Sequence, residues 1–488
     1  MAKVTHIAAI SIPAFSHQAS ILEFCKRLVH LYPNIHVTCI FPTIDSPPSA
    51  TITFLQSLPS SNVGHIFLPP INKQNLPQDA PPAVQIQLAV SQSMPSFRAT
   101  LHQLHSTTPF VALIADTFAT EALEVARDLS FNLSSFIYFP PSSMTLSVFL
   151  HLKTLHEEVS CEYRDHKEPI LIPGCIPIYG HDLPEHFRDR SSISYELILR
   201  LSKRLLSLAD GFLVNSFSEI ERVTAIAIEE EQQRRKKNTP VYLIGPVIQT
   251  GPSSDQNGPE CLRWLENQRP KSVLYVSFGS GGTLSQEQLN EMALGLEQSG
   301  QKFLWVLRAP SDSANAAYLG AENNDPLSFL PRGFLERTKG QGLVICNWAP
   351  QTQILSHSST GGFLTHCGWN STLESIVMGV PMITWPLFAE QRMNAVLLTE
   401  GLRVALRPKF NSSGIVEREE IAVVVKGLMV GEETNGIRQR IGELKDAAAN
   451  ALKEDGSSTR DIFQFVTRLE NLTRGHQTFD ESTLSKKP

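Results

Sequence analysis

The sequence has few cysteines and no excess of positive charge. Its seven cysteines among 488 residues are scattered, and none stands in Cys-x-x-Cys spacing, so the pattern predicts neither a disulfide framework nor a structural zinc site. Lys and Arg number 42 against 48 Asp and Glu, and the net charge of −6 argues against a nucleic-acid partner or a polybasic membrane surface. We expect a monomer whose partners are small molecules.

Long apolar runs and a metal-binding pair of aspartates are also missing. The run from Ile7 to Ile12 follows a single Lys3 and is broken at Pro13, which makes it too short for a signal peptide or a membrane span. A cytoplasmic location is therefore the expectation. The chain contains no Asp-x-Asp pair, the usual clamp for Mg²⁺ or Mn²⁺ on a diphosphate, so we expect neither a metal nor another cofactor.

What the chain does have is an alternation of strand and helix patterns, which predicts an α/β fold with parallel sheets covered on both faces. At 488 residues it is too long for one core, so two domains are expected. The Pro- and Gly-rich segment Tyr242–Glu260 is predicted to be the linker between them. Strands are predicted at Val4–Ile12, His36–Phe41, His65–Leu68, Phe110–Ala115, Leu133–Phe139 and Gly211–Asn215 before it, and at Ser272–Phe278, Phe303–Leu307 and Leu343–Asn347 after it.

Beyond these strands, the segment Ala309–Pro331 is predicted to be a mobile surface loop. Helices are predicted at Val416–Met429, Gly436–Lys453 and Ser458–Leu472. Two doubly wound domains place a cleft between the carboxyl ends of their sheets, which is where such folds bind ligands.

The stretch from Trp348 to Gln391 carries the strongest chemical signal. A helix that opens with Asn370 and Ser371 directly after a strand presents free backbone N–H groups and a positive dipole end to a phosphate. His366 adds a side-chain donor there. Glu374 lies one turn later on the same face, where a carboxylate suits ribose hydroxyls better than phosphates.

The two ends of this stretch suit the remaining parts of a sugar nucleotide. Trp348 offers a flat apolar face for a base, and the pair Glu390 and Gln391 offers several hydrogen-bonding groups for a sugar. The structural alternative is an ordinary Rossmann-like half, in which the Trp packs in the core and the Asn is only a helix cap.

The stretch resembles the signature box of plant family 1 UDP-sugar-dependent glycosyltransferases, with its W-A-P-Q opening, H-C-G-W-N-S-x-x-E centre and E-Q close. The resemblance implies the GT-B fold, two doubly wound Rossmann-like domains that face each other across a cleft. It places the acceptor in an N-terminal domain of residues 1–249 and the UDP-sugar in a C-terminal domain of residues 250–457. Helix 458–472 would cross back to the first domain and be followed by a flexible tail at 473–488.

The same resemblance implies roles for the donor residues. A Gln at the end of the box goes with glucose donors in the family, so the expected donor is UDP-glucose. The implied contacts are uracil for Trp348, base or ribose for Gln351, ribose for Glu374, diphosphate for His366, Asn370 and Ser371, and sugar for Trp369, Glu390 and Gln391.

His17 and Asp116 are the candidate catalytic residues. His17 begins the first predicted helix, at the turn where the family has its catalytic His. Its pKa is expected to be lowered by the helix N-terminus, which would leave a neutral base for the acceptor hydroxyl. Asp116 follows the strand Phe110–Ala115 in a run that fits the family pattern, and it could orient the imidazole. Taken alone, the His could be a polar cap and the Asp a helix N-cap.

A glycine-rich turn follows the strand Ser272–Phe278. Ser277 and Ser280 could donate to the diphosphate there, although the motif alone is weak because it lacks the Lys of a P-loop. The turn resembles the family's phosphate-facing loop, in the form found in the branch that glucosylates small phenols such as hydroquinone. One departure is that the run Pro13-Ala14-Phe15-Ser16-His17 stands where the family usually has P-G-x-G-H, so that Phe15 and Ser16 add bulk beside the catalytic His.

The sequence therefore predicts an inverting, metal-independent UDP-glucosyltransferase. It would form a β-glucoside on a hydroxyl of a flavonoid, an isoflavonoid or a simple phenol. Three alternatives stay open at this point: transfer to an aromatic carbon, a sugar-nucleotide-binding protein without transferase activity, and a nicotinamide-dependent oxidoreductase. The last is disfavoured because no G-x-G-x-x-G follows the first strand.

Overall fold

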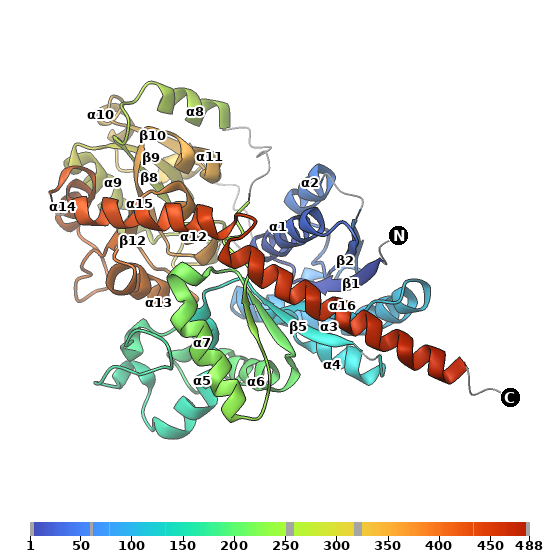
Figure 1. Ribbon diagram of the computed structural model, residues 1–488. Helices are drawn as coiled ribbons and strands as arrows, with labels where there is room; N and C mark the ends of the chain where they lie inside the picture. Colours follow the sequence, from blue (N-terminus) through green and yellow to red (C-terminus); the bar gives the residue numbers. More distant parts are fainter. Residues whose placement is uncertain are drawn as a thin grey trace.

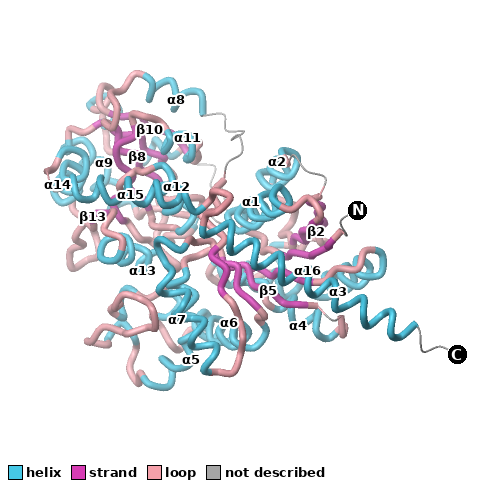
Figure 2. Tube along the Cα trace, in the orientation of Figure 1, coloured by secondary structure: helices cyan, strands magenta, loops and turns pink. Residues whose placement is uncertain are grey.

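The computed structural model describes residues 4–58, 62–77, 79–131, 133–249, 258–316, 325–432 and 434–484, with side chains described as far as residue 472. Its strands form two parallel sheets, each between layers of helices (Figures 1 and 2). We call the part built on the first sheet the first lobe and the part built on the second sheet the second lobe. The boundary predicted between residues 249 and 250 borders residues outside those described, and it stays a prediction.

The first sheet has seven strands in the order β3-β2-β1-β4-β5-β6-β7. They are β1 (Thr5–Ile10), β2 (Ile35–Phe41), β3 (Val63–Phe67), β4 (Ala112–Asp116), β5 (Ser134–Phe139), β6 (Gly211–Val214) and β7 (Val241–Leu243). The strands read as continuous apolar runs because both faces are covered. On β1, Ile7 and Ala9 pack toward one helix layer, whereas Ala8 and Ile10 belong to the core on the other side.

Helices cover both faces of the first sheet. One layer consists of α1 (Phe15–Leu31), α2 (Ser49–Ser57) and the final helix α16 (Ser457–Leu484). The other consists of α3 (Pro82–Thr107), α4 (Glu121–Asp128), α5 (Ser143–Glu158), α6 (Ile193–Leu208) and α7 (Ser218–Arg234).

The second sheet repeats this winding with six strands in the order β10-β9-β8-β11-β12-β13. They are β8 (Val273–Ser277), β9 (Lys302–Leu307), β10 (Gly342–Cys346), β11 (Thr360–Thr365), β12 (Met382–Thr384) and β13 (Ala405–Leu406). On one face lie α9 (Gln286–Ser299), α10 (Phe334–Arg337) and α14 (Arg418–Val430). On the other lie α8 (Gly258–Glu266), α11 (Gln351–Ser356), α12 (Trp369–Met378), α13 (Gln391–Val396) and α15 (Thr434–Ala451).

The linker prediction is wrong at both of its ends. β7 lies inside the predicted linker, and Tyr242 and Ile244 are buried in the first lobe. Further along, the side chain of Asn215 bonds both the N–H and the carbonyl of Val247, at 2.7 and 3.0 Å. A three-residue strand is too short to show a period, so the surrounding Pro and Gly dominated the prediction. At the other end α8 begins at Gly258, and residues 250–257 lie outside the described part of the chain.

The predicted surface loop is also only partly described, because residues 317–324 lie outside the described residues. Its first part packs on the second lobe: the Ser311 N–H donates to the Leu284 carbonyl at 2.8 Å, and the Thr283 N–H donates to the Ala314 carbonyl at 3.0 Å. Near its end, Pro326–Phe329 forms a short 3-10 helix.

Helix α16 leaves the second lobe and lies along the first (Figure 1). Arg27 of α1 holds its beginning, since one guanidinium nitrogen donates to the Ile244 carbonyl at 2.8 Å and to Ser458 Oγ at 2.7 Å. The Asp461 carboxylate accepts the Leu243 N–H at 2.7 Å and so gives a hydrogen-bond partner to the backbone of β7, the strand at the edge of the sheet. The helix runs through Leu484, beyond the predicted end at residue 472, and residues 485–488 lie outside the described residues.

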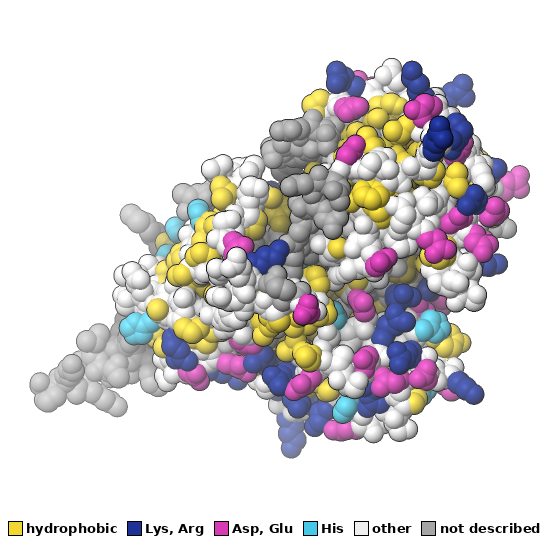
Figure 3. Space-filling model, turned by 180° about the vertical axis from the view of Figure 1, so that it is seen from behind, with side chains coloured by type: hydrophobic (Ala, Val, Ile, Leu, Met, Phe, Trp, Pro, Cys, Tyr) yellow, Lys and Arg dark blue, Asp and Glu magenta, His cyan; other side chains and the backbone are white. Residues whose placement is uncertain are grey.

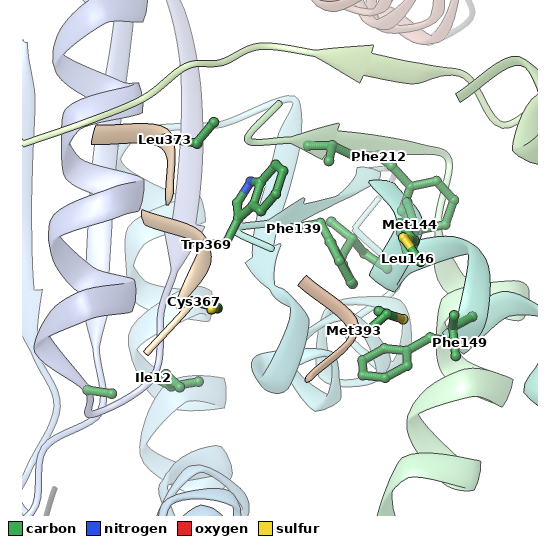
Figure 4. Packing of buried hydrophobic residues seen from close by; sticks show 14 of the residues in the cluster. Ile12, Phe139, Met144, Leu146, Phe149, Phe212, Cys367, Trp369, Leu373 and Met393 are labelled. Carbon is green, nitrogen blue, oxygen red and sulfur yellow. The ribbon is translucent and has the colours of Figure 1, made fainter. Parts of the chain in front are cut away.

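The two lobes share one apolar core. Its buried residues come from both sheets and include the ten labelled in Figure 4: Ile12, Phe139, Met144, Leu146, Phe149 and Phe212 of the first lobe, and Cys367, Trp369, Leu373 and Met393 of the second. A partly buried ion pair adds to this contact, with Arg407 Nη2 2.6 Å from Asp182 Oδ1. On the outer face seen in Figure 3, positive and negative side chains are intermixed over both lobes.

Candidate active site

A cavity of about 450 Å³ lies between the lobes. It opens at the carboxyl ends of both sheets, the expected place for a ligand in doubly wound folds. Every candidate site residue from the sequence lines it except Asp116, which lies behind His17. The lining residues from that set are His17, Ser277, Ser280, Trp348, Gln351, His366, Trp369, Asn370, Ser371, Glu374, Glu390 and Gln391.

His17 and Asp116 meet where the strand order of the first sheet reverses. β1 and β4 are parallel neighbours with Ile10 opposite Ala115, so the residues after β1 lie beside Asp116. There His17 Nδ1 lies 2.8 Å from Asp116 Oδ2. Asp116 is fully buried, and its Oδ1 accepts the Phe118 N–H at 3.0 Å. The carboxylate therefore contacts the imidazole and caps the following helical turn at the same time.

The expected lowering of the His17 pKa is wrong. Burial does lower the pKa of His17, but the charge of Asp116, the hydrogen bond to it and the charge of Glu390 together outweigh burial and raise the pKa above its ordinary value. Helix α1 begins at Phe15, so His17 lies inside its first turn. The His17 side chain is 21% exposed and lines the cavity. Its environment thus favours the protonated ring, opposite to the direction that the sequence predicts.

His366 and the glycine turn meet at the matching reversal point of the second sheet, where β8 and β11 are parallel neighbours. Gly279 has φ +72°, and a Cβ on it would lie 2.4 Å from His366 Nε2, so only glycine fits here. Burial, aided by the charge of Arg308, lowers the pKa of His366 to about 3. The ring is therefore neutral near pH 7, and its Nδ1 is buried without a hydrogen-bond partner among the described residues.

The start of α12 brings amide, hydroxyl and carboxylate groups to the cavity. Gln351 Nε2 donates to Ser371 Oγ at 2.8 Å and to Glu374 Oε2 at 2.6 Å. Burial raises the pKa of Glu374 to about 7 against the opposing hydrogen bond from Gln351. Asn370 Nδ2 donates across the cleft to the Ser16 carbonyl at 3.3 Å, beside His17. The first N–H groups of the helix have no partner within it and can bind an anion.

The two tryptophans of the candidate site differ in their surroundings. Trp348 follows β10 and is 43% exposed at the cavity, so its ring face is accessible to a flat ligand. Trp369 is buried, and its indole N–H donates to the Asn215 carbonyl at 2.7 Å, which joins the lobes. Its side-chain N–H is thus committed, and its backbone N–H at the first helical position is the group left for a ligand.

The start of α13 contributes Glu390 and Gln391 to the cavity lining. Burial raises the pKa of Glu390, whose charge in turn acts on His17. Gln391 Oε1 accepts the N–H groups of Leu387 and Phe388 at 2.9 and 3.0 Å. Since its oxygen is occupied, Gln391 presents its Nε2 donor to the cavity.

The sequence reasoning missed two groups of cavity residues. Arg308, the first residue after β9, lines the cavity and could have been noticed by the same rule that found Asp116. The second group is the apolar wall near His17, which includes Phe118, with its ring centre 5.8 Å from that of the imidazole. Phe15, already singled out in the sequence beside His17, lies on this wall as well. No sequence motif marks its other residues, which are Ile86, Pro141, Phe149, Leu197, Ile198 and Leu201.

The described residues contain no group of three or more His, Cys, Asp and Glu side chains placed to hold a metal ion. None of the described helices is long and apolar enough to cross a membrane. All seven cysteines are free thiols.

Comparisons with known proteins agree on one family. The family model for UDP-glucuronosyl and UDP-glucosyl transferases matches residues 253–418. A hydroquinone glucosyltransferase from Rauvolfia serpentina is 49% identical over 96% of this chain and 99% of its own length. UDP-glycosyltransferase 72B1 from Arabidopsis thaliana is 48% identical over 94% and 95%.

Solved structures give the same result for the fold. A Phytolacca americana glycosyltransferase in complex with UDP-2-fluoro-glucose and pterostilbene is 45% identical over 96% of this chain and 100% of that one, with a TM-score of 0.86. A Polygonum tinctorium UDP-glucosyltransferase capable of glucosylating indoxyl, in complex with 3,4-dichloroaniline, is 46% identical over 96% and 99%, with a TM-score of 0.86. The predicted GT-B architecture is thereby confirmed.

Proposed function

Because this chain belongs to the plant family 1 UDP-glycosyltransferases, we propose that it transfers glucose from UDP-glucose to a hydroxyl of a small phenolic acceptor and forms a β-glucoside. The observation that carries the proposal is that His17, held by Asp116 behind it, lines the same cavity as the donor-type residues of the Trp348 to Gln391 stretch. A base and a sugar-nucleotide site in one cavity suit a direct displacement at the sugar's anomeric carbon.

In this mechanism His17 takes the proton of the acceptor hydroxyl. Its Nδ1 is engaged with Asp116, which leaves Nε2 as the base. The acceptor oxygen forms a bond to the anomeric carbon while the bond from that carbon to the diphosphate oxygen breaks, and the electron pair leaves with UDP. One displacement inverts the anomeric centre, so an α-linked donor gives a β-glucoside. Asp116 stabilises the imidazolium that forms.

The donor is proposed to lie along the second lobe. Trp348 would stack on uracil, Gln351 and Glu374 would bind base and ribose, and the start of α12 with His366, Ser277 and Ser280 would bind the diphosphate. The backbone of Trp369 and the side chains of Glu390 and Gln391 would contact the glucose. Hydrogen-bond donors and the helix dipole then take the place of a metal clamp.

The acceptor is proposed to lie against the apolar wall of the first lobe. Phe15 and Phe118 flank His17 there, and aromatic faces favour a flat phenolic ring. Among the named relatives, one is a hydroquinone glucosyltransferase, one was solved with pterostilbene, and one is capable of glucosylating indoxyl and was solved with 3,4-dichloroaniline, all of them aromatic molecules. Flavonoids, isoflavonoids and simple phenols are the classes to test.

The first test is mass spectrometry of the protein incubated with UDP-glucose and a panel of phenols, flavonoids and isoflavonoids, with EDTA and no added metal. We expect a hexosylated product that β-glucosidase cleaves. A product that resists both β-glucosidase and acid would show attack by carbon instead of oxygen. UDP binding without transfer to any acceptor would contradict the proposed function and favour a sugar-nucleotide-binding protein.

Replacing Asp116 by Asn tests the pair through its pH dependence. His17 must be neutral to accept a proton, so in the wild type kcat/KM for the acceptor, measured at saturating UDP-glucose, is expected to fall as the pH drops through a His17 pKa that Asp116 and Glu390 raise. Without the Asp116 charge burial prevails, and this acid limb should move to lower pH. The plateau should also fall about 10- to 100-fold, because the imidazole loses its orienting partner. An acid limb that stays in place would contradict the role given to Asp116.

A further inference from the structure

Arg308 is the only Lys or Arg among the described residues that line the cavity. Three carboxylates line the same cavity, those of Glu185, Glu374 and Glu390. A sugar nucleotide adds the negative charges of its diphosphate, and the released nucleoside diphosphate carries one more. Within the described lining, Arg308 is thus the single permanent positive charge beside three carboxylates and the diphosphate of the ligand. Because the carboxylates repel an anion, the diphosphate is held best near Arg308.

Arg308 lies directly beneath the glycine turn. It follows β9, the parallel neighbour of β8, so its guanidinium reaches the turn that begins where β8 ends. Its Nη1 donates to the carbonyl of Gly279 and, at 3.2 Å, to that of Gly282. The carbonyl oxygens of Gly279 and Gly282 are therefore both held by the arginine, and Ser280 between them lines the cavity.

Arg308 also acts on the neighbouring imidazole. Its charge adds to burial in lowering the pKa of His366, so this ring stays neutral and serves as a hydrogen-bonding group only. Gly279 packs directly on the same ring, as the 2.4 Å approach of a Cβ at that position shows. The turn, the imidazole and the guanidinium therefore form one contiguous wall, and the permanent charge on that wall comes from Arg308.

We propose that Arg308 is a positioning residue for the diphosphate of the donor. It fixes the Gly279–Gly282 turn against His366 and supplies the positive charge that holds the diphosphate and favours its departure. As the bond from the anomeric carbon to oxygen breaks, the electron pair moves to the β-phosphate, and the attraction to Arg308 grows with that charge. The inference rests on the proposed function for the identity of the ligand.

The test compares ligands that differ only in phosphate. Binding of UDP, UMP and uridine is measured by calorimetry for the wild type, Arg308→Met and Arg308→Lys. We expect Arg308→Met to weaken UDP binding about tenfold or more, UMP less, and uridine hardly at all, because a charge-assisted contact is lost only with phosphates. Arg308→Lys should recover most of the UDP affinity. Raising the salt concentration should weaken UDP binding more in the wild type than in Arg308→Met.

Arg337→Met is the matched control. Arg337 lies in the same lobe and pairs with Glu297 on the surface at 2.6 Å, so the substitution changes the net charge equally but away from the cavity. Its UDP affinity should equal that of the wild type. Unchanged UDP binding in Arg308→Met would overturn the proposal. So would equal losses for UDP and uridine in both Arg308 variants, which would mean that the arginine only supports the fold.

These measurements need no acceptor and no turnover, so they separate the inference from the proposed function. A wild type that transfers glucose, together with an Arg308→Met protein that binds UDP normally, would refute the inference alone. A wild type that transfers to no acceptor would refute the function, while a selective loss of UDP affinity would still support Arg308.

Discussion

Replacing His17 by Ala is expected to lower kcat/KM for a weakly acidic hydroxyl acceptor by about 10²- to 10⁴-fold, the range that a positioned general base contributes. The imidazole is held 2.8 Å from a fully buried carboxylate and lines the cavity shared with the donor-type residues. Asp116 is behind it and cannot reach the acceptor in its place. The measurement is the initial rate of glucoside formation at saturating UDP-glucose.

Binding and a distant histidine serve as controls for this substitution. UDP affinity should stay close to that of the wild type, because the donor-type residues belong to the second lobe. His6→Ala removes an imidazole from the opposite end of the first sheet, where His6 pairs with the ring of His36, and should leave the rate unchanged. Turnover of His17→Ala at the wild-type rate would rule out the base role, and a more acidic phenol should show a smaller loss than a weakly acidic one.

Replacing Glu374 by Ala is expected to weaken UDP-glucose binding by about 1.5–3 kcal/mol, the value of hydrogen bonds to a charged group. This corresponds to roughly 10- to 150-fold in Kd. Glu374 is buried, and Gln351 Nε2 holds one of its oxygens at 2.6 Å, so the carboxylate is fixed before the donor arrives. Calorimetric titration with UDP-glucose and with UDP gives the loss directly.

The pH dependence of donor binding offers an independent check on Glu374. Its pKa in the unliganded protein is about 7, so donor binding that requires the carboxylate should weaken as the pH falls below 7 and should release a proton there. Glu374→Gln keeps the shape but not the charge, and its donor affinity should not vary over this range. Equal donor affinity in the Ala variant and the wild type would assign the ribose contact to another residue.

Much of the architecture could be predicted because each apolar run locates a buried strand and, with it, the carboxyl end of that strand. In a parallel sheet those ends gather at one edge, and His17, Asp116 and His366 all follow or end such runs. The sequence could not show which strands are neighbours. That β9 lies beside β8, and so brings Arg308 under the glycine turn, depends on the winding of the sheet.

Two other features depend on contacts distant in sequence. The pKa of His17 is raised partly by Glu390 of the other lobe, whereas the local helix N-terminus predicts the opposite direction. β7 is only three residues long. It is stabilised by backbone pairing with β6 and by the hydrogen bond from the Leu243 N–H to Asp461 of the last helix. Neither the charge of Glu390 nor the hydrogen bond from Asp461 can be recognised in the residues around His17 or in β7, because both come from residues far away in the sequence.

The grip of Arg27 has a mechanical consequence. Ile244 follows β7 and Ser458 lies at the start of α16, and one guanidinium nitrogen of Arg27 binds at both places. Arg27 therefore ties both segments to α1, ten residues along that helix from His17, which is about 15 Å at the rise of a helix. Over that distance, a tilt of α1 by about 4° about Arg27 would displace His17 by about 1 Å, enough to spoil a reactive alignment. The residue that holds both segments and the proposed base are thus carried by the same helix.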